Sequence, residues 1–372
     1  MGNGRKDKKD TLIIHSITRL YLGGAQNICF SILDYLKNKG YNVKLITGKD
    51  ENLSDKFINA DIEIININEL DRSINPFLDF LSFFRIRKLL LLEKRKYRNV
   101  IVHSHTSKAG IITRFAAYSC GIKDIYHTVH GWSFYKGQNK LLFYIYVIIE
   151  RIVEKFTKIL ITVSNYSMNL GLICKIGSKR KYKTIYNGLN KPIILKNKSF
   201  IKDKLNIPKS KIIILQVSCL KNQKSPLDFV KIAEYMIYNK NLFFIIAGDG
   251  ILKNKLIKYI QKRKINNVLL LGWYNNIYEL YNIANIFILT SIFEGMPLTI
   301  LEAISYDIPI IATDIGANKE ILTNYKYLCK PHDIDCFVRN INKLINKSKK
   351  IKYDFNYTEK EMLREYERLY DL

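Results

Sequence analysis

Two carboxylates in the segment SIFEGMPLTILEA, residues 291–303, have a spacing that suits the binding of hydroxyl groups. Glu294 lies just before a Gly-Met-Pro turn, and Glu302 lies in an apolar stretch that predicts a helix from Leu298 to about Ser305. The start of a helix binds anions such as phosphate. A carboxylate near a phosphate is repelled unless it accepts hydrogen bonds from neutral hydroxyls, which sugars present in pairs. The segment therefore predicts a sugar-nucleotide site with one diol at each glutamate. The diphosphate would lie against Gly295, Met296, Pro297 and Leu298.

Two lysines follow a predicted strand, in the segment CLKNQKSP at residues 219–226. The run KIIILQVS ends directly before this segment, so Lys221 and Lys224 lie where an open parallel sheet binds its ligands. An ammonium group at this place stabilises the negative charge that develops on a departing diphosphate. The alternative for each lysine is a solvated surface charge.

A histidine and a pair of glycines lie at two further strand ends. His130 closes the run DIYHTVH, and Gly23 and Gly24 in LYLGGAQNICFSIL allow a tight turn and close approach of a ligand to the backbone. The glycine pair lacks the G-x-G-x-x-G fingerprint, and no acidic partner stands about 20 residues later, which argues against an NAD-dependent enzyme. Three further histidines are interpreted as strand or loop residues: His103, His105 and His127.

Short runs rich in Ile, Val and Leu alternate with helical stretches along the chain. Such continuous apolar runs predict strands of parallel sheets that are buried on both faces. The first series covers residues 11–17, 41–47, 99–105, 124–130 and 158–164, and the second covers 211–218, 241–250, 267–273, 286–291 and 308–314. We therefore predict an α/β fold with two Rossmann-like, doubly wound domains whose strand-end loops face a central cleft.

The domain boundary is predicted at the Asn187-Gly188 turn and the Lys-rich stretch after it. The amino-terminal domain would cover residues 1–190 and the carboxy-terminal domain residues 191–355. Residues 356–372 have Leu and Tyr at helical spacing after Thr358, which predicts a last helix that packs toward the amino-terminal domain.

The chain of 372 residues carries a formal net charge of +27, with 60 Lys+Arg against 33 Asp+Glu. This charge favours an anionic partner, namely nucleic acid, an acidic membrane or a phosphorylated small molecule; compositional bias toward Lys is the alternative. The stretch from Pro76 to Lys96 mixes Phe and Leu with Lys and Arg, so it predicts either a helix on an anionic membrane or a core-facing helix. The longest apolar run, LLFYIYVII at 141–149, is too short to cross a bilayer, which takes about 20 residues.

The six cysteines show no C-x-x-C pair and no zinc-type spacing with histidine. We therefore expect reduced thiols and a cytoplasmic protein, with the inner face of the cell membrane as an alternative location. The basic start MGNGRKDKKD precedes an apolar stretch that is shorter than a signal peptide needs.

The segment EGMPLTILEA, followed by IPIIATDIGANKEI, resembles the E-x7-E signature of glycosyltransferase family 4, whose members are retaining enzymes with the GT-B fold. Similar segments occur in the same order over most of the chain: the glycine pair, HTVHGWSF, TVSNYS, IYNGL, CLKNQKSPLDFV and AGDG. The resemblance implies a sugar nucleotide as the ligand of these segments.

The resemblance also implies a role for each matching residue. Glu294, His130 and Lys224 would be catalytic: His130 would touch the donor sugar, and Lys224 would contact the diphosphate. Cys219 stands where the family has an arginine, and Lys221 two positions later is the alternative cation. Gly24 would face the donor phosphates, and both glycines of the pair would lie on the acceptor side.

The implied reaction moves a hexosyl or N-acetylhexosaminyl group from a nucleotide-diphosphate sugar, UDP-type by preference, to an acceptor hydroxyl without a metal or other cofactor. Similarity to enzymes of capsule and surface-polysaccharide synthesis favours a lipid-linked glycan as the acceptor, with a soluble glycan as the alternative. Two other functions are an epimerase of the same fold and, more remotely, a non-catalytic nucleic-acid-binding protein. The tyrosines are dispersed and no RNA-binding signature is visible, so we expect no nucleic acid as a partner.

Overall fold

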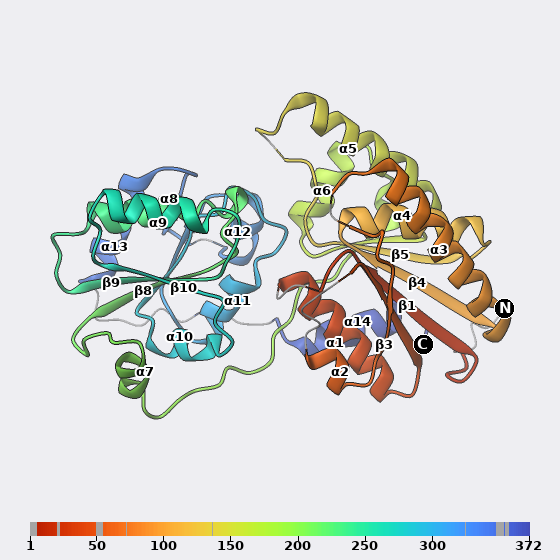
Figure 1. Ribbon diagram of the computed structural model, residues 1–372, viewed down its shortest axis with the longest axis horizontal. Coiled ribbons are helices and arrows are strands. Elements are labelled where there is room, and N and C mark those ends of the chain that lie inside the picture. Colours follow the sequence, from red (N-terminus) through yellow and green to blue (C-terminus); the bar gives the residue numbers. More distant parts are fainter. Residues whose placement is uncertain are drawn as a thin grey trace. The chain divides into compact units, whose positions relative to one another are not determined.

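The computed structural model describes residues 6–20, 23–49, 55–71, 73–135, 137–323, 325–346, 353 and 357–372. The chain divides into two compact units (Figure 1). Unit 1 comprises Met1–Gly188 and Glu359–Leu372, and unit 2 comprises Leu189–Thr358. The boundaries predicted from the sequence were 1–190, 191–355 and 356–372.

Unit 1 contains a seven-stranded sheet of parallel strands in the order β3-β2-β1-β4-β5-β6-β7. The strands are β1 (Thr11–Ile17), β2 (Asn42–Thr47), β3 (Glu63–Asn66), β4 (Asn99–His105), β5 (Asp124–Val129), β6 (Ile159–Thr162) and β7 (Tyr182–Thr184). The helices are α1 (Gly24–Asn38), α2 (Asp55–Asn59), α3 (Pro76–Lys96), α4 (Ser107–Ser119), α5 (Lys140–Val153), α6 (Asn165–Ile173) and α14 (Glu359–Leu369), with short 3-10 turns η1 (Glu154–Phe156) and η2 (Lys179–Lys181).

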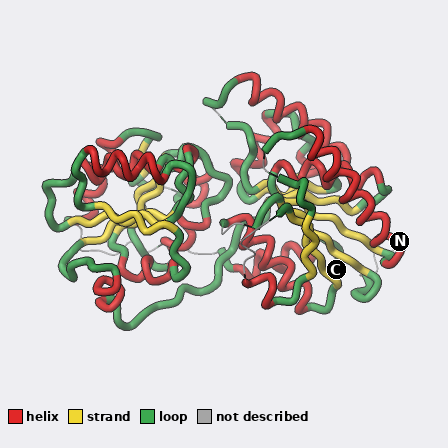
Figure 2. The backbone as a smooth tube through the Cα atoms, viewed as in Figure 1, coloured by secondary structure: helices red, strands yellow, loops and turns green. Residues whose placement is uncertain are grey.

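Helices cover both faces of the unit 1 sheet (Figures 1 and 2). Helices α3, α4 and α5 lie on one face, with α4 in contact with both of its neighbours. The opposite face carries α1 and α14, which pack together. Two hydrogen bonds tie this pair, from Ser31 Oγ to Glu359 Oε1 and from Tyr35 Oη to Glu367 Oε2, both at 2.5 Å. The last helix is therefore an integral part of unit 1.

Unit 2 repeats this architecture with a six-stranded parallel sheet in the order β10-β9-β8-β11-β12-β13. The strands are β8 (Ile212–Val217), β9 (Leu242–Ala247), β10 (Val268–Gly272), β11 (Ile286–Leu289), β12 (Ile310–Thr313) and β13 (Leu328–Cys329). The helices are α7 (Ser199–Lys204), α8 (Pro226–Tyr235), α9 (Lys253–Lys262), α10 (Ile277–Ile283), α11 (Leu298–Ser305), α12 (Gly316–Ile321) and α13 (Ile334–Ile345), with the turn η3 (Asn222–Lys224). One core lies under α8, α9 and α13 and the other under α7, α10 and α11.

The apolar runs of the sequence coincide with the central strands. All seven residues of β1 and all four of β11 are buried, as expected for strands covered on both faces. In each sheet the strand order reverses between the first strand and the fourth, that is, between β1 and β4 and between β8 and β11. Open α/β sheets bind ligands at the carboxyl ends of the strands beside this switch point.

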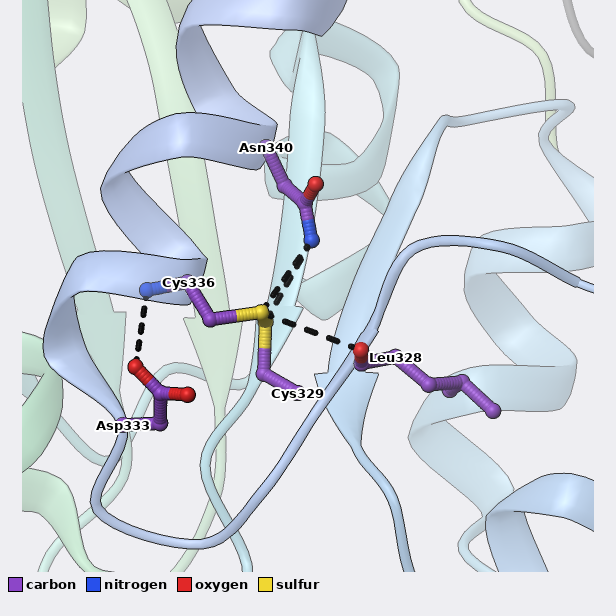
Figure 3. The surroundings of a disulfide bond; sticks show 5 residues. All are labelled: Leu328, Cys329, Asp333, Cys336 and Asn340. Carbon is purple, nitrogen blue, oxygen red and sulfur yellow. Dashed lines mark hydrogen bonds between the residues drawn. A yellow bond between two sulfur atoms is a disulfide. The ribbon is translucent and has the colours of Figure 1, made fainter.

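The expectation of reduced cysteines is wrong at one place, because Cys329 and Cys336 form a disulfide (Figure 3). Cys329 ends β13, and Cys336 lies in the first turn of α13. The cap of that helix, in which Asp333 Oδ1 accepts from the Cys336 backbone N–H at 2.9 Å, brings the two Cα atoms to 5.7 Å. The six intervening residues carry no recognised disulfide pattern, so the sequence did not reveal the bond. The other four cysteines are free thiols.

No helix in the described parts of the chain is long and apolar enough to span a bilayer.

Candidate functional site

The predicted lysine and glutamate segments meet at the switch point of unit 2, after β8 and β11. Ile292 donates its backbone N–H to the carbonyl of Gln223 at 2.8 Å, and Gln223 Nε2 donates to the carbonyl of Phe293 at 2.9 Å. Thr290 Oγ1 also donates to the carbonyl of Lys224 at 2.9 Å. These bonds hold the two loops side by side, so their charged side chains are fixed relative to one another.

Lys224 and Glu294 form an ion pair in which Nζ lies 2.5 Å from Oε1. The Glu294 side chain is 7% exposed and that of Lys224 is 17% exposed, so the pair is largely screened from water. The sequence assigned these two residues to different parts of a ligand, and the structure shows that they bind each other. Lys221 precedes η3 in the same loop and is half-buried.

Glu302, on α11, accepts a hydrogen bond at Oε2 from the hydroxyl of Tyr281 at 2.5 Å. Desolvation raises the pKa of the Glu302 carboxyl, and the Tyr281 bond partly offsets this shift. Among the described residues, Oε1 of Glu302 has no hydrogen-bond partner and can accept from a ligand. Glu302 therefore has a fixed orientation and one open acceptor oxygen.

The helix that the sequence predicted from Leu298 to about Ser305 is α11, which spans Leu298–Ser305. Pro297 is the N-cap residue rather than the first helical residue, and no side chain in the described parts of the chain caps the helix. Ile300 donates its backbone N–H to the Pro297 carbonyl at 3.1 Å, so the backbone N–H groups of Leu298 and Thr299 are left for a ligand or water. Met296 is buried, at 5% exposure, so this residue of the predicted set contributes packing or backbone contacts.

Two glycines of the AGDG segment allow close packing of the β9 turn against the lysine loop. A Cβ atom on Gly248 would lie 2.0 Å from the carbonyl oxygen of Ser218, and one on Gly250 would lie 2.6 Å from that of Leu220. Both glycines also have positive φ, at 139° and 157°. Asp249 accepts from the Gly250 backbone N–H and from Lys253, so it serves the turn.

In unit 1 the glycine pair follows β1 at the other switch point. Gly23 is the N-cap residue of α1 and Gly24 is its first residue. Gly23 has φ −168°, an extended conformation that any residue adopts. The turn therefore does not require the backbone freedom of a glycine at this position. Across the switch point, the hydroxyls of Thr18 and Thr106 join the loops after β1 and β4 at 2.8 Å.

His130 follows β5 directly and is half-buried. Its Nε2 lies 2.9 Å from Nδ1 of His105, and the two rings stack with centroids 5.2 Å apart. Burial lowers the pKa of His130 to about 4, so the imidazole is neutral near pH 7. A neutral imidazole offers one donor and one acceptor, which suits hydrogen bonding to a sugar better than charge stabilisation.

The sequence reasoning missed a buried polar group that surrounds His105. His103 and His105 alternate with Ser104 and so point to the same face of β4, and His15 lies opposite His103 in the β1–β4 register. Their ring nitrogens lie within 4.8 Å of one another, a spacing at which three imidazoles could hold a metal ion. The sequence His103-Ser104-His105 could have indicated two histidines on one face of a strand. It could not have indicated His15, which lies on a strand far away in sequence.

Comparisons with known proteins identify the family. The family model described as Glycosyltransferase Family 4 matches residues 22–191, and the one described as Glycosyl transferases group 1 matches residues 197–362. An Escherichia coli protein named UDP-Gal:alpha-D-GlcNAc-diphosphoundecaprenol alpha-1,3-galactosyltransferase is 33% identical over 85% of this chain and 83% of its own length. The chain belongs to glycosyltransferase family 4. The comparisons do not favour the epimerase or the nucleic-acid-binding protein.

Other relatives of this glycosyltransferase agree with the fold. The Staphylococcus aureus capsular polysaccharide biosynthesis glycosyltransferase CapH is 25% identical over 94% of this chain and 97% of its own length. A solved Rickettsia africae glycosyltransferase matches with a TM-score of 0.76 at 22% identity, covering 97% of this chain and 98% of that one. Anabaena HepE, solved with UDP and glucose, matches with a TM-score of 0.80 at 15% identity, covering 96% and 98%. The two Rossmann-like units are those of a GT-B glycosyltransferase.

Proposed function

We propose that this glycosyltransferase moves a sugar from a UDP-type donor to a hydroxyl of a lipid-linked glycan in the synthesis of a surface polysaccharide, with retention of the anomeric configuration. The observation that carries the proposal is the Lys224–Glu294 pair at the switch point of unit 2, beside the uncapped start of α11. HepE binds UDP, and the E. coli relative is named for a diphosphoundecaprenol-linked acceptor; both support this choice of donor and acceptor.

Each group of unit 2 has a chemical task in this proposal. Lys224 and the first N–H groups of α11 bind the diphosphate and stabilise its charge as the sugar leaves. A lost preorganised donor of this kind costs about 2.7–4 kcal/mol in the transition state. A helix terminus contributes only about 0.3–2 kcal/mol. The larger share therefore falls to Lys224, and the proposal needs no metal.

The two glutamates accept from sugar hydroxyls. Glu302 offers Oε1, while Glu294 offers the carboxylate oxygen that Lys224 does not occupy. In the proposal His130 contacts the donor sugar. The departing diphosphate accepts the proton of the acceptor hydroxyl. As the family pattern implies, Gly23 and Gly24 remain assigned to the acceptor side. Gly24 and Lys221 remain assigned to the donor phosphates.

The test uses purified protein, a panel of nucleotide sugars and two lysine variants. A UDP-sugar is expected to raise the melting temperature, and Lys224→Ala is expected to lower turnover by roughly 10²- to 10³-fold. Lys258→Ala, an exposed lysine on α9, is the matched control and should keep wild-type turnover. Wild-type turnover in Lys224→Ala would remove this lysine from the site, and a product of inverted configuration in NMR spectra would refute retention.

A membrane surface is the partner that we propose for the outer face of unit 1. Its helix α5 exposes six apolar side chains by 41–70%: Leu141, Leu142, Tyr144, Ile145, Ile148 and Ile152. On α3, Phe77, Phe80 and Phe84 are 46–68% exposed, while Ile86 and Leu90 are buried, so this helix has both a core face and an apolar outer face. On the same helix, α3, the apolar side chains of Phe84, Leu91 and Leu92 line a shallow pocket together with Arg87, Lys88 and Arg95.

Lipid fits this face better than a protein partner does, because cations lie among the apolar groups. Basic and apolar residues on one helix face are typical of helices that lie in the interface of an anionic membrane. A lipid-linked acceptor would be presented at the same surface. We therefore propose that the enzyme binds peripherally to an anionic membrane through α3 and α5, on the cytoplasmic side where nucleotide sugars are available.

A further inference from the structure

Behind His130, a continuous series of hydrogen-bonding groups crosses the sheet of unit 1. Its members, which we call the His–Tyr chain, are in order Tyr366, Thr128, His103, Tyr370, His15, His105 and His130. The six groups behind His130 are each no more than 1% exposed. Two of them belong to α14 or the residue after it, so the carboxy-terminal segment is linked to His130 by polar contacts.

The distances along the His–Tyr chain are those of hydrogen bonds. Tyr366 Oη lies 3.3 Å from Thr128 Oγ1, which lies 2.7 Å from His103 Nε2. His103 Nδ1 contacts the Tyr370 hydroxyl, which lies 3.1 Å from His15 Nε2.

The second half of the chain joins three imidazoles. His15 Nδ1 lies 3.0 Å from His105 Nε2, and His105 Nδ1 lies 2.9 Å from His130 Nε2. Cys29 Sγ also approaches His15 Nδ1, at 3.6 Å, and because a thiol is only a weak donor, this contact does not decide which nitrogen of His15 carries the proton. Both ring nitrogens of His103, of His15 and of His105 therefore have partners.

The imidazoles of this chain have hydroxyls, other imidazoles and the Cys29 thiol as partners, and no carboxylate among the described residues, so nothing there stabilises a charged ring. Burial also disfavours the charged form, so each ring is neutral, which sets the number of protons. Each neutral ring carries one N–H and one bare nitrogen. Each hydroxyl likewise carries one proton, so the chain has two head-to-tail arrangements of its protons, which run in opposite directions.

The position of Tyr366 selects between these two directions. Among the described residues, the only hydrogen-bond partner of its hydroxyl is Thr128 Oγ1, so its proton has one acceptor. A buried hydroxyl that donates to nothing is strongly disfavoured. Tyr366 therefore donates to Thr128, and Thr128 in turn donates to His103 Nε2.

The remaining protons follow from this first donation. His103 carries its proton on Nδ1 and donates to Tyr370, and Tyr370 donates to Nε2 of His15. His15 then donates from Nδ1 to His105, and His105 donates from Nδ1 to Nε2 of His130. The proton of His130 must lie on Nδ1, the ring nitrogen that has no partner among the described residues.

We propose that the His–Tyr chain fixes His130 as its Nδ1–H tautomer, so that this residue presents a hydrogen-bond donor to the substrate. Tyr366, Thr128, Tyr370, His15, His103 and His105 are then positioning residues that act through His130. The use of this donor toward a sugar rests on the proposed function, whereas the tautomer itself does not.

The test reads the tautomer by NMR in the protein without substrate. Two-bond ¹H–¹⁵N correlation spectra of the full chain, labelled with ¹⁵N-histidine, distinguish Nδ1–H from Nε2–H for each ring, and the peak lost in His130→Gln gives the assignment. Wild-type His130 is expected to be Nδ1–H. Tyr370→Phe and Tyr366→Phe keep the aromatic packing but interrupt the chain, so both are expected to populate the Nε2–H form.

Tyr126→Phe is the matched control. Tyr126 is also fully buried, its ring packs on Tyr370 with centroids 5.1 Å apart, and its hydroxyl donates outside the chain, to the carbonyl of Leu369 at 3.2 Å. This variant loses a similar buried hydroxyl and should keep the wild-type tautomer. An Nε2–H form in wild type, or identical spectra in Tyr370→Phe and wild type, would overturn the proposal.

Two further readouts separate the possible failures. One bound zinc per chain would mean that His15, His103 and His105 hold a metal in place of the proton chain, and this would also overturn the proposal. In activity assays, Tyr370→Phe is expected to lower kcat/KM by about 3- to 10-fold relative to Tyr126→Phe. A shifted tautomer with unchanged kcat/KM would remove His130 from the proposed sugar contact and leave the proton chain established.

Discussion

At the scale of single residues, the Lys224–Glu294 pair shows how one contact prepares a binding site without a ligand. An ammonium group has three donor hydrogens, so Lys224 can keep its bond to Glu294 and still donate to a diphosphate. The pair holds a long side chain in place before the substrate arrives, which reduces the reorganisation that charge stabilisation requires. Lysine is a point charge, so it would not reproduce the paired donors of the arginine that the family resemblance implies at the position of Cys219.

Buried neutral histidines make the stability of unit 1 depend on pH. In the unfolded chain a histidine has a pKa near 6.5, whereas the folded values are about 3 for His15 and about 4 for His130. Between these values the unfolded state binds more protons. The stability that comes from burying these two neutral histidines is therefore fully present above pH 6.5. It is lost as the pH falls through 6.5 toward the folded pKa values of about 4 and 3.

Urea denaturation between pH 7.5 and pH 5 measures this dependence. The free energy of unfolding should decrease with falling pH, and each buried histidine contributes a limiting slope of about 1.4 kcal/mol per pH unit. His15→Asn should lower stability at pH 7.5 but reduce the slope. Equal slopes in wild type and His15→Asn would show that His15 does not carry the effect.

At the scale of helices and strands, the predictable part of the fold is its buried centre. The central strands are continuous apolar runs, and their ends locate Lys224 and Glu294. By contrast β3, β7 and β13 were missed, because each is a sheet edge of at most four residues with partly exposed side chains. The His–Tyr chain was missed for another reason: His15 and Tyr370 are 355 positions apart, and single-sequence patterns contain no register between such distant residues.

The Cys329–Cys336 bond is an element-scale feature whose effect on stability can be measured. It joins β13 to α13 across a short loop, and closing a loop of this length stabilises by about 2 kcal/mol in the chain-entropy model. A reducing agent should therefore lower the free energy of unfolding by about that amount. Cys336→Ser should be less stable than wild type under non-reducing conditions and insensitive to the reductant. A wild type that is equally indifferent to reductant would contradict the prediction.

At the scale of the whole molecule, the charge of +27 has a function only if some of it is concentrated on a surface that uses it. Cations in ion pairs, such as Lys44 with Glu93 and Lys158 with Asp124, do not contribute to this excess, because each pair is neutral. The outer face of α3 differs, because Arg87, Lys88 and Arg95 lie among exposed apolar side chains. Neighbouring apolar and cationic groups distinguish a membrane-binding face from general solubilising charge.

Vesicle flotation tests this membrane proposal. The wild-type protein should float with phosphatidylglycerol vesicles, bind phosphatidylcholine vesicles weakly, and be released by salt, because surface attraction is screened within about 10 Å at 0.1 M salt. Each basic residue near an anionic surface contributes about 1 kcal/mol, so replacing both Arg87 and Lys88 by serine should weaken binding by about 30-fold. Ile148→Ser on α5 should weaken it by at least about 10-fold through lost apolar burial.

The matched control is Ile251→Ser, which removes an isoleucine that is 84% exposed in unit 2 and lies outside the proposed face. Its binding should equal that of wild type. If this variant and Ile148→Ser lost affinity equally, the binding would be non-specific. If wild type ignored anionic vesicles, α3 and α5 would not form a membrane surface, while turnover on a soluble acceptor would still depend on Lys224, since the donor site of unit 2 is chemically independent of that face.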